Sequence, residues 1–392
     1  MKSYWQIGSI FGIPLLLHTS WFFVLALFTL HFGSSWQQQN WSSTTAWSAG
    51  FAMALLLFAS VLLHELGHCL VARSQGISVK SITLFLFGGV AAIESESPTP
   101  GKALQVAIAG PAVSFGLCVL LLLLRILLPL PEPAAIVLET LASINLILAL
   151  FNMIPGLPLD GGQVLKAVIW QVTGSRRQGV RWAARVGQGL SWLAIAAGIG
   201  IYFASSLRAI GWLWIALLGW FGTRSASAYR RVANLQEALL HLKAGAVMNC
   251  NLTAIDAHLS VGNLASMQAQ QSAIYRVVDH QRDLGILWPE AVPISSADTA
   301  PVTTLMEPIA DLAIIDEAAP LKTVVEQLET PLRLVVVSAT GQIVGSIDRG
   351  DVVQAIGQWL KLPVAATVID RIRAENTYPP GLALEEIARA AS

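Results

Sequence analysis

The chain has 392 residues, of which 54% are hydrophobic and 12% are charged, and its mean hydropathy is +0.61. This composition indicates a membrane protein and excludes an ordinary secreted or cytosolic domain, while the length predicts two or more domains. The net charge is zero, which gives no indication of a nucleic-acid partner. The three cysteines are too scattered to predict a disulfide framework or a cysteine zinc site.

Six apolar stretches are predicted to cross the membrane as helices, at residues 13–32, 49–72, 103–128, 134–154, 185–204 and 208–222. The last stretch is short for a straight crossing. No small-residue cleavage site follows the first stretch, so we expect a retained helix rather than a signal peptide. If both termini are cytosolic, the basic residues lie on the cytosolic side of the membrane, except Arg125 and Arg208, which lie near the outer face. The positive-inside rule therefore predicts a multi-pass protein, most simply of the cell membrane, with cytosolic N- and C-termini.

The second predicted span contains the sequence His64-Glu65-Leu66-Gly67-His68. On a helix, His64 and His68 lie four residues apart on one face, the spacing at which both rings can reach one zinc ion. Glu65 is placed to orient a water molecule at that ion and to take its proton. Ionisable groups at bilayer depth cost a few kcal/mol each and persist mainly at functional sites. The motif therefore predicts a metal site within the membrane.

Between the second and third spans, residues 81–93 contain two β-branched or aromatic runs that flank Gly88 and Gly89. This pattern predicts a β-hairpin. A hairpin at the membrane face would expose a strand edge that could pair with an extended peptide, and a simple surface hairpin is the alternative. The third span opens with small residues around Gly110, which favour close helix packing.

The fourth span ends at Asn152, and two prolines and three glycines follow by residue 162. Broken backbone at membrane depth is tolerated only where protein or a water-filled cavity surrounds it. Asp160 within this segment is therefore predicted to be the third ligand beside His64 and His68, with the fourth position left to water. The alternative is that Asp160 caps the next helix, as an Asp before a helical run often does.

Four further polar residues lie in or near the apolar spans. His18 and His31 are rival ligands, but isolated histidines near a span end are more commonly hydrogen-bonded. Asn145 is expected to bridge helices within the membrane. Asn152 could instead donate to a substrate carbonyl or to the oxyanion formed from it.

The composition changes from Thr223 onward. Residues 224–243 are predicted to form a basic amphipathic juxtamembrane helix. Residues 244–360 alternate strand and helix patterns and contain two degenerate copies of one unit, about 57 residues apart, which indicates a paired module. Residues 361–392 form a weakly helical tail. The predicted domains are thus 1–223, 224–243, 244–360 and 361–392.

These motifs make residues 10–225 resemble the site-2 protease family of membrane-embedded zinc metalloproteases. His64–His68 resembles the zinc helix, Phe87-Gly88-Gly89 the membrane-associated hairpin, and Asn152-x-x-Pro155-x-x-Pro158-x-Asp160-Gly161 the second signature. The resemblance implies one Zn²⁺ on His64, His68 and Asp160, with Asn152, Gly88 and Gly89 at the substrate. Gly110-Pro111 matches the start of the third helix. Ser114 stands where many members carry Asn, a departure expected to leave the zinc ligands untouched.

The segment between Ile93 and Lys102 is too short for a PDZ-type insert. The resemblance is therefore to the branch with a pair of cystathionine-β-synthase-type (CBS) domains, as in the sporulation-factor protease group. It implies an all-α polytopic membrane domain, with six helices and the hairpin, followed by a soluble α/β CBS-type pair.

CBS modules bind adenine nucleotides through a Thr or Ser for phosphate and an Asp for ribose. In the second repeat Asp351 matches the ribose position, but Asp348 replaces the hydroxyl residue and would repel phosphate. Trp288 and Ala291 occupy the two positions in the first repeat. The pattern argues against nucleotide binding and favours homodimerisation or substrate contact.

The sequence as a whole predicts an intramembrane zinc metalloendopeptidase. The resemblance implies that its substrate is a membrane-tethered anti-sigma or transcription factor, whose cytosolic domain is released by cleavage of a transmembrane segment. Two alternatives stay open, a transporter or channel gated by the CBS-type pair and a catalytically inactive scaffold that recruits membrane partners.

Overall fold

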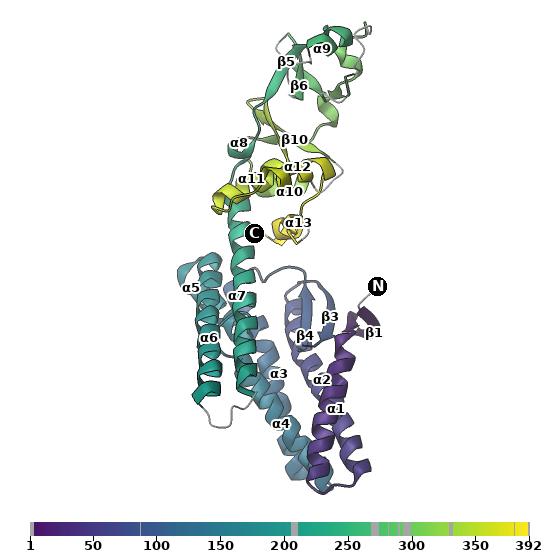
Figure 1. Cartoon of the computed structure of the whole chain (residues 1–392), viewed down its shortest axis with the longest axis vertical. Coiled ribbons are helices and arrows are strands. Elements are labelled where there is room, and N and C mark those ends of the chain that lie inside the picture. The colour runs from purple at the N-terminus through teal and green to yellow at the C-terminus, as the bar shows by residue number, and fades with distance from the viewer. Residues whose placement is uncertain are drawn as a thin grey trace. The chain divides into compact units, whose positions relative to one another are not determined.

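The computed structural model describes residues 4–86, 88–204, 211–267, 274–280, 282–288, 291–292, 299–328, 332–379 and 381–390 (Figure 1). Contacts divide the chain into two compact units, 1–233 and 234–392. The boundary lies within one continuous helix, α7 (Gly211–His241). This helix therefore contains the described part of the sixth predicted span together with nearly all of the predicted juxtamembrane helix.

The first unit contains a four-stranded sheet in the order β1-β2-β3-β4. Its strands are β1 (Tyr4–Ile10), β2 (Ile13–His18), β3 (Val79–Phe85) and β4 (Gly88–Ile93). The β1–β2 and β3–β4 pairs are antiparallel, and β2 runs parallel to β3. Alternate residues of β2 and β3 face inward and pack against Leu66 and Cys69 of a neighbouring helix, α2. β4 is therefore an edge strand.

The prediction of a helix from residue 13 is wrong for residues 13–18, which form β2. Ile13, Leu15 and Leu17 are buried, whereas the residues between them are half-buried, as the two-residue period of a strand requires. The run is almost wholly apolar, so periodicity in the sequence does not separate strand from buried helix. The helix begins only at Ser20.

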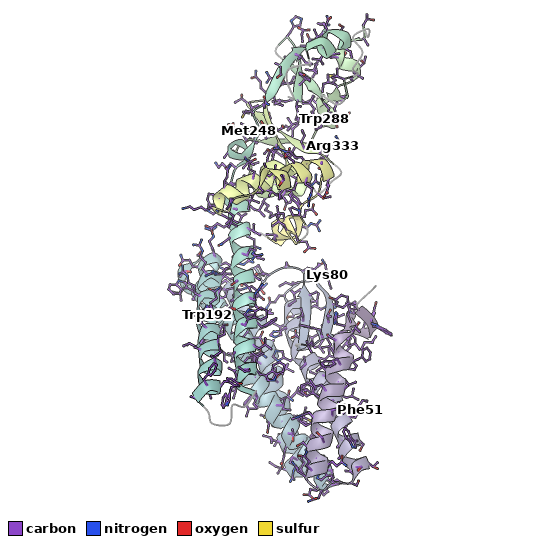
Figure 2. All side chains as sticks on the ribbon, viewed as in Figure 1. Phe51, Lys80, Trp192, Met248, Trp288 and Arg333 are labelled. Atoms are coloured by element: carbon purple, nitrogen blue, oxygen red, sulfur yellow. The ribbon has the colours of Figure 1, made fainter. Side chains whose placement is uncertain are left out.

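Six helices precede α7 in the first unit: α1 (Ser20–Gln38), α2 (Ser43–Ser74), α3 (Pro100–Leu127), α4 (Glu132–Asn152), α5 (Asp160–Thr173) and α6 (Arg176–Ala204). Within the described residues, α2, α3, α4 and α6 are long and apolar enough to cross a membrane. Large apolar side chains on these helices, such as Phe51 and Trp192, are exposed and suit a lipid environment (Figure 2).

Helix α5 is not among the six spans predicted from the sequence. α4 ends at Asn152, the chain turns through residues 153–159, and α5 starts at Asp160. A Cβ on Gly161 would collide with the carbonyl oxygens of Met153 and Ile154, so only glycine lets the new helix pack this closely on the turn. The turn and the glycines together fix where the first residue of α5 lies.

The second unit contains two copies of one βαββ arrangement. The first consists of β5 (Leu252–Asp256), α9 (Val261–Met267), β6 (Ile274–Asp279) and β7 (Arg282–Leu287), and the second of β9 (Ile314–Asp316), α10 (Leu321–Gln327), β10 (Leu334–Ala339) and β11 (Gln342–Asp348). In each copy the first strand is parallel to the second, which is antiparallel to the third. Ile286, Val336 and Ile343 pack between the two sheets. The predicted soluble α/β region with an internal repeat is thus an α/β unit of two related parts.

The second copy continues into α11 (Arg349–Trp359), α12 (Ala366–Glu375) and α13 (Leu384–Ala390). Short elements complete the unit: α8 (Ala244–Val247), β8 (Glu307–Pro308) and two 3-10 turns at Val302–Thr304 and Ile309–Asp311. Ile372 and Leu384 of the C-terminal segment lie in the same buried cluster as Leu321 and Val325 of α10. The segment predicted as a weakly helical tail therefore belongs to the core of the second copy.

Candidate metal centre

The side chains of His64, His68 and Asp160 meet inside the first unit. Both imidazoles are buried on α2, with ring centroids 5.1 Å apart. Asp160 Oδ2 lies 3.1 Å from His64 Nε2 and 3.4 Å from His68 Nε2. One ligand atom from each residue lies within 4.8 Å of the other two. The structure therefore brings two nitrogens and one oxygen to a common point.

The far nitrogen of each ring is held by helix α3. His68 Nδ1 lies 2.7 Å from the carbonyl oxygen of Val106, and His64 Nδ1 lies 2.9 Å from Ser114 Oγ. Because a carbonyl can only accept, His68 Nδ1 carries the proton and Nε2 keeps its lone pair for a metal. Ser114, which stands where many family members carry Asn, contacts a ligand ring through its hydroxyl, and His64, His68 and Asp160 still come together as expected. A polar residue one turn after Gly110 in an apolar span was the available signal.

Gly110 of α3 lies directly against the two imidazoles. A Cβ at this position would be 2.6 Å from His64 Nε2 and closer still to His68 Nε2. The small residue therefore makes room for the ligand atoms as well as for helix packing. The donor atoms are two imidazole nitrogens and one carboxylate oxygen, and the space beside them is so small that one methyl group would fill it. This arrangement fits a catalytic zinc site, which keeps its fourth position open.

Asp160 does not cap α5, so the capping alternative does not describe it. The N-cap residue of α5 is Leu159, and no side chain caps this helix end. Asp160 is the first helical residue, and its carboxylate faces the imidazoles instead. A negative side chain in the first turn is also favoured by the helix dipole.

The edge strand β4 lies against Glu65. A Cβ on Gly89 would be 2.5 Å from Glu65 Cγ and 3.2 Å from Cδ, and the backbone amide of Ala91 donates to the Glu65 carboxylate. Gly88 has a φ of +125°, which disfavours other residues. Phe87, the first residue of the predicted hairpin motif, lies outside the described residues. Glu65, which follows His64 in the sequence, therefore lies beside the edge strand β4.

The other polar residues lie outside this group. His18 Nδ1 is 2.8 Å from Ser20 Oγ, and the ring of His31 packs edge-on against Phe32. Asn145 donates from α4 to Ser60 Oγ of α2 at 3.0 Å, which confirms its predicted role as a bridge between helices. Asn152 is half-buried at the last position of α4, just before the turn that leads to Asp160.

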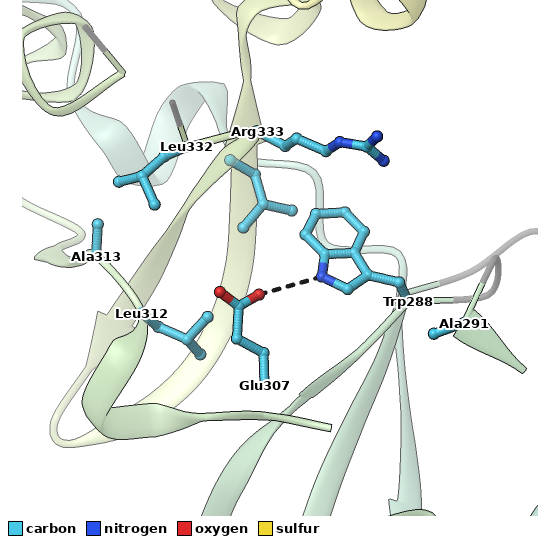
Figure 3. Close-up of a pocket in the computed structure, with 8 residues that line it drawn as sticks. Trp288, Ala291, Glu307, Leu312, Ala313, Leu332 and Arg333 are labelled. Carbon is cyan, nitrogen blue, oxygen red and sulfur yellow. Dashed lines mark hydrogen bonds between the residues drawn. The ribbon is translucent and has the colours of Figure 1, made fainter. Parts of the chain in front are cut away.

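The second unit contains a cavity of about 410 Å³ between the two copies (Figure 3). Trp288 and Ala291, two positions singled out in the sequence, help to line it. Trp288 Nε1 donates to Glu307 Oε2 at 3.2 Å, and the Arg333 side chain extends near the indole in Figure 3. The counterparts of Trp288 and Ala291 in the second copy, Asp348 and Asp351, do not line this cavity.

In the second copy, Arg373 of α12 is ion-paired with both carboxylates. Arg373 Nε lies 2.9 Å from Asp348 Oδ2, and its Nη2 lies 2.8 Å from Asp351 Oδ1. Asp348 and Asp351 also cap the start of α11 reciprocally. The guanidinium and the helix end together therefore satisfy both acidic side chains.

Family models and known proteins match most of this chain. The family model of peptidase family M50 matches residues 52–135 and 132–194, and the CBS domain model matches residues 302–358. The chain is 41% identical over 363 residues to a protein of Synechocystis sp. named as a zinc metalloprotease, covering 90% of this chain and 95% of that one. A zinc metalloprotease of Methanocaldococcus jannaschii is 28% identical over 353 residues, covering the same shares.

Among solved structures, the site-2 protease from Methanocaldococcus jannaschii matches with 28% identity and a TM-score of 0.43, covering 58% of this chain and 95% of that chain. The extent and identity of the Synechocystis match, together with the family model, decide the assignment. The chain belongs to peptidase family M50, the site-2 proteases, and is a zinc metalloprotease with a C-terminal CBS domain.

Proposed function

We propose that the protein is an intramembrane endopeptidase that cleaves a transmembrane segment of a membrane-tethered regulatory protein, of the anti-sigma or transcription factor type, and so releases a cytosolic domain. The observation that carries this proposal is that Asp160 meets His64 and His68 beside Glu65. The two histidines and Glu65 lie on α2, a helix apolar enough to cross a membrane. A protease whose donor atoms are buried among apolar helices is suited to a substrate that reaches it through the bilayer.

In this proposal His64, His68 and Asp160 hold one Zn²⁺. When bound, the ion supplies Lewis acidity that polarises a peptide carbonyl and makes water a stronger nucleophile at neutral pH. Glu65 accepts the proton of the attacking water as its oxygen adds to the carbonyl carbon. Glu65 then delivers that proton to the amide nitrogen as the carbon–nitrogen bond breaks. The products are a carboxylate and an amine.

The substrate reaches Glu65 as an extended strand along the free edge of β4. β4 is the last strand in the sheet order, so its outer backbone groups are available for pairing. Gly89 lets the backbone of β4 pass close to Glu65, because any side chain there would collide with the glutamate, and Gly88 supplies a φ of +125° just before it. A substrate helix must unwind first, because its carbonyls are otherwise hydrogen-bonded, and Gly or Pro residues in the substrate ease that step. Asn152 is assigned the role of hydrogen-bond donor to the substrate carbonyl.

The protein is assigned to the cell membrane, with six spans and both termini in the cytosol. Its proposed domains are the protease at 1–223, a linker helix at 224–243, the CBS-type pair at 244–360 and the tail at 361–392. His68 lies near the C-terminal end of α2, which faces the cytosol in this topology. That position supports release of the cytosolic part of the substrate.

The CBS-type pair is proposed to act by homodimerisation or by contact with the substrate. The ion pair of Arg373 with Asp351 supports this proposal, because it occupies the acidic group that would otherwise meet a ribose. A nucleotide phosphate would also meet Asp348, which repels it.

The proposed chemistry is tested with purified full-length protein in liposomes, together with a membrane-spanning reporter. Glu65→Gln should retain zinc, because Glu65 is not a ligand, and should lower cleavage by about 10²–10⁴-fold through loss of the proton carrier. Cleavage of the reporter by Glu65→Gln at the wild-type rate would contradict the assigned role. An anti-sigma-type transmembrane segment cut no faster than an unrelated single span would contradict the substrate class.

A further inference from the structure

A short polar linker joins β4 to α3 and is fastened to the end of α2. The Glu94 amide donates to the carbonyl of Ser78 at 3.0 Å, and Ser97 Oγ donates to Gln75 Oε1 at 3.0 Å. Gln75 is the C-cap residue of α2. The linker is therefore joined to the end of the helix that carries His64 and His68.

Glu96, in the middle of this linker, reaches across to two other helices. Its Oε2 lies 3.1 Å from Lys166 Nζ on α5 and 2.8 Å from Arg176 Nη2 at the start of α6. Lys166 is only 7% exposed, and Gly179 of α6 packs against its backbone. A buried ammonium group is stable only with a partner, so Glu96 is held where Lys166 is.

Charge balance supports the same contact. Burial alone would raise the pKa of Glu96, but the positive charges of Lys166 and Arg176 outweigh burial and hold the pKa below its ordinary value. Glu96 is therefore ionised, and the bridge is intact, at neutral pH.

The bridge matters because of where α5 begins. Asp160 is the first residue of α5, and Lys166 follows within two turns. α5 packs mainly against α3 and α6 rather than against α2. The imidazoles and the carboxylate thus belong to two helices that have few direct contacts with each other, and α3 and the Glu96 bridge join them.

We propose that Glu96 is a positioning residue for the metal centre: by joining the end of α2 to Lys166 of α5, it holds Asp160 at the distance from His64 and His68 at which all three side chains bind Zn²⁺. The inference rests on the ligand set of the proposed function. It concerns metal affinity and geometry, so it is measurable without a substrate.

The same linker supplies a matched control. Glu94, two residues earlier, is ion-paired with Lys80 at 3.4 Å, and the two side chains are 43% and 69% exposed. Both Lys80 and Glu94 belong to the sheet side, so this pair does not reach α5. Exposed pairs of this kind contribute little to stability.

The experiment measures the affinity of detergent-purified full-length protein for Zn²⁺ by competition with a chelator, and the visible absorption of the Co²⁺-loaded protein as a report on ligand geometry. Glu96→Gln should bind Zn²⁺ about 10–100-fold more weakly, as is typical when a group that orients a ligand is lost, and should alter the Co²⁺ spectrum. Glu94→Gln should match the wild type in both. An unchanged affinity and spectrum for Glu96→Gln would overturn the inference.

A double variant separates positioning from simple neutralisation of Lys166 and covers the case in which Glu96→Gln does not fold. Glu96→Gln combined with Lys166→Met removes the unpaired cation together with the bridge. The inference predicts that it folds yet stays weak in Zn²⁺ binding. Wild-type affinity in the double variant would show that Glu96 only neutralises Lys166. Wild-type protein that binds no Zn²⁺ at all would instead contradict the proposed function.

Discussion

Two clusters of polar side chains, one at a helix N-terminus in each unit, both contain aspartate and differ in what faces the carboxylates. At the start of α5, Asp160 faces two imidazoles that are held on their far sides by Ser114 and Val106. At the start of α11, two carboxylates face one guanidinium. The first cluster offers two imidazole nitrogens and one carboxylate oxygen as metal ligands, whereas Arg373 supplies the second cluster with a permanent cation. The first cluster is therefore suited to a metal ion, and the second is closed.

A glycine lies against the partner groups in both clusters: Gly110 against the imidazoles and Gly350 against Arg373. Substitution by alanine should have the largest predicted effect, on Zn²⁺ affinity, at the first glycine and only a small effect, on stability, at the second. Gly110→Ala would drive a methyl group into two buried rings that cannot move away, so Zn²⁺ affinity should fall by about 100-fold or more. In Gly350→Ala the new Cβ would lie 2.9 Å from Arg373 Nε, and this side chain is 39% exposed and can shift. Its effect on stability should stay within about 1 kcal/mol.

Chelator competition measures the first effect and thermal unfolding the second. Gly116→Ala is a further control on α3, because nothing lies within 4 Å of the new Cβ. Wild-type zinc affinity in Gly110→Ala would show that the two rings do not converge beside this residue.

Replacing one aspartate in each cluster should have the next largest effect on the metal. Asp160→Asn replaces an anionic ligand by a neutral amide, so both zinc content and reporter cleavage should fall at least about tenfold. Asp351→Asn should leave both unchanged, because Arg373 already occupies that cluster. Metal analysis and the cleavage assay on the two variants provide the comparison. Equal zinc loss in both variants would remove the distinction between the clusters.

The smallest predicted effect is a pH dependence confined to the second cluster. Burial, followed by the charge of Asp348, raises the pKa of Asp351 to about 6. A raised carboxyl pKa means that the folded state holds a proton which the unfolded state has released. The stability around α11 should therefore fall as the pH rises from about 4 to about 6.

Amide hydrogen exchange in α11 of the full-length protein measures this change as a free energy of opening. Asp351→Asn should flatten the dependence between pH 4 and 6, because no proton is then released at this position. The same slope in wild type and Asp351→Asn would assign the pH dependence to another group.

The parts of the site that follow from local helix geometry could be predicted from the sequence. His64 and His68 share one face because four residues make about one turn, and their rings lie 5.1 Å apart. Asp160 is 96 residues from His64, and only the chemistry of the ligand set pointed to it. Ser114 and Glu96 act through contacts between distant helices, for which the sequence contains no periodic signal.

The fold shows the same division. The long apolar helices α2, α3, α4 and α6 are evident from hydropathy, because their windows are uniformly apolar. β2 was taken for helix because Ile13–Leu17 is too short and too apolar to show a period. α5 lies outside the predicted spans because a 14-residue helix that carries Gln163 and Lys166 resembles a polar connection in hydropathy. The C-terminal helices are placed by packing on the second copy of the repeat.

The proposed mechanism requires that His64, His68 and Asp160 bind one zinc ion together. X-ray absorption at the zinc edge of the full-length protein tests it most directly. We expect one zinc per chain, with two imidazole nitrogens at about 2.0–2.1 Å and a carboxylate oxygen at about 2.0–2.2 Å, and with the oxygen contribution altered in Asp160→Ala. Zinc bound through sulfur, or a coordination shell that Asp160→Ala leaves unchanged, would contradict it.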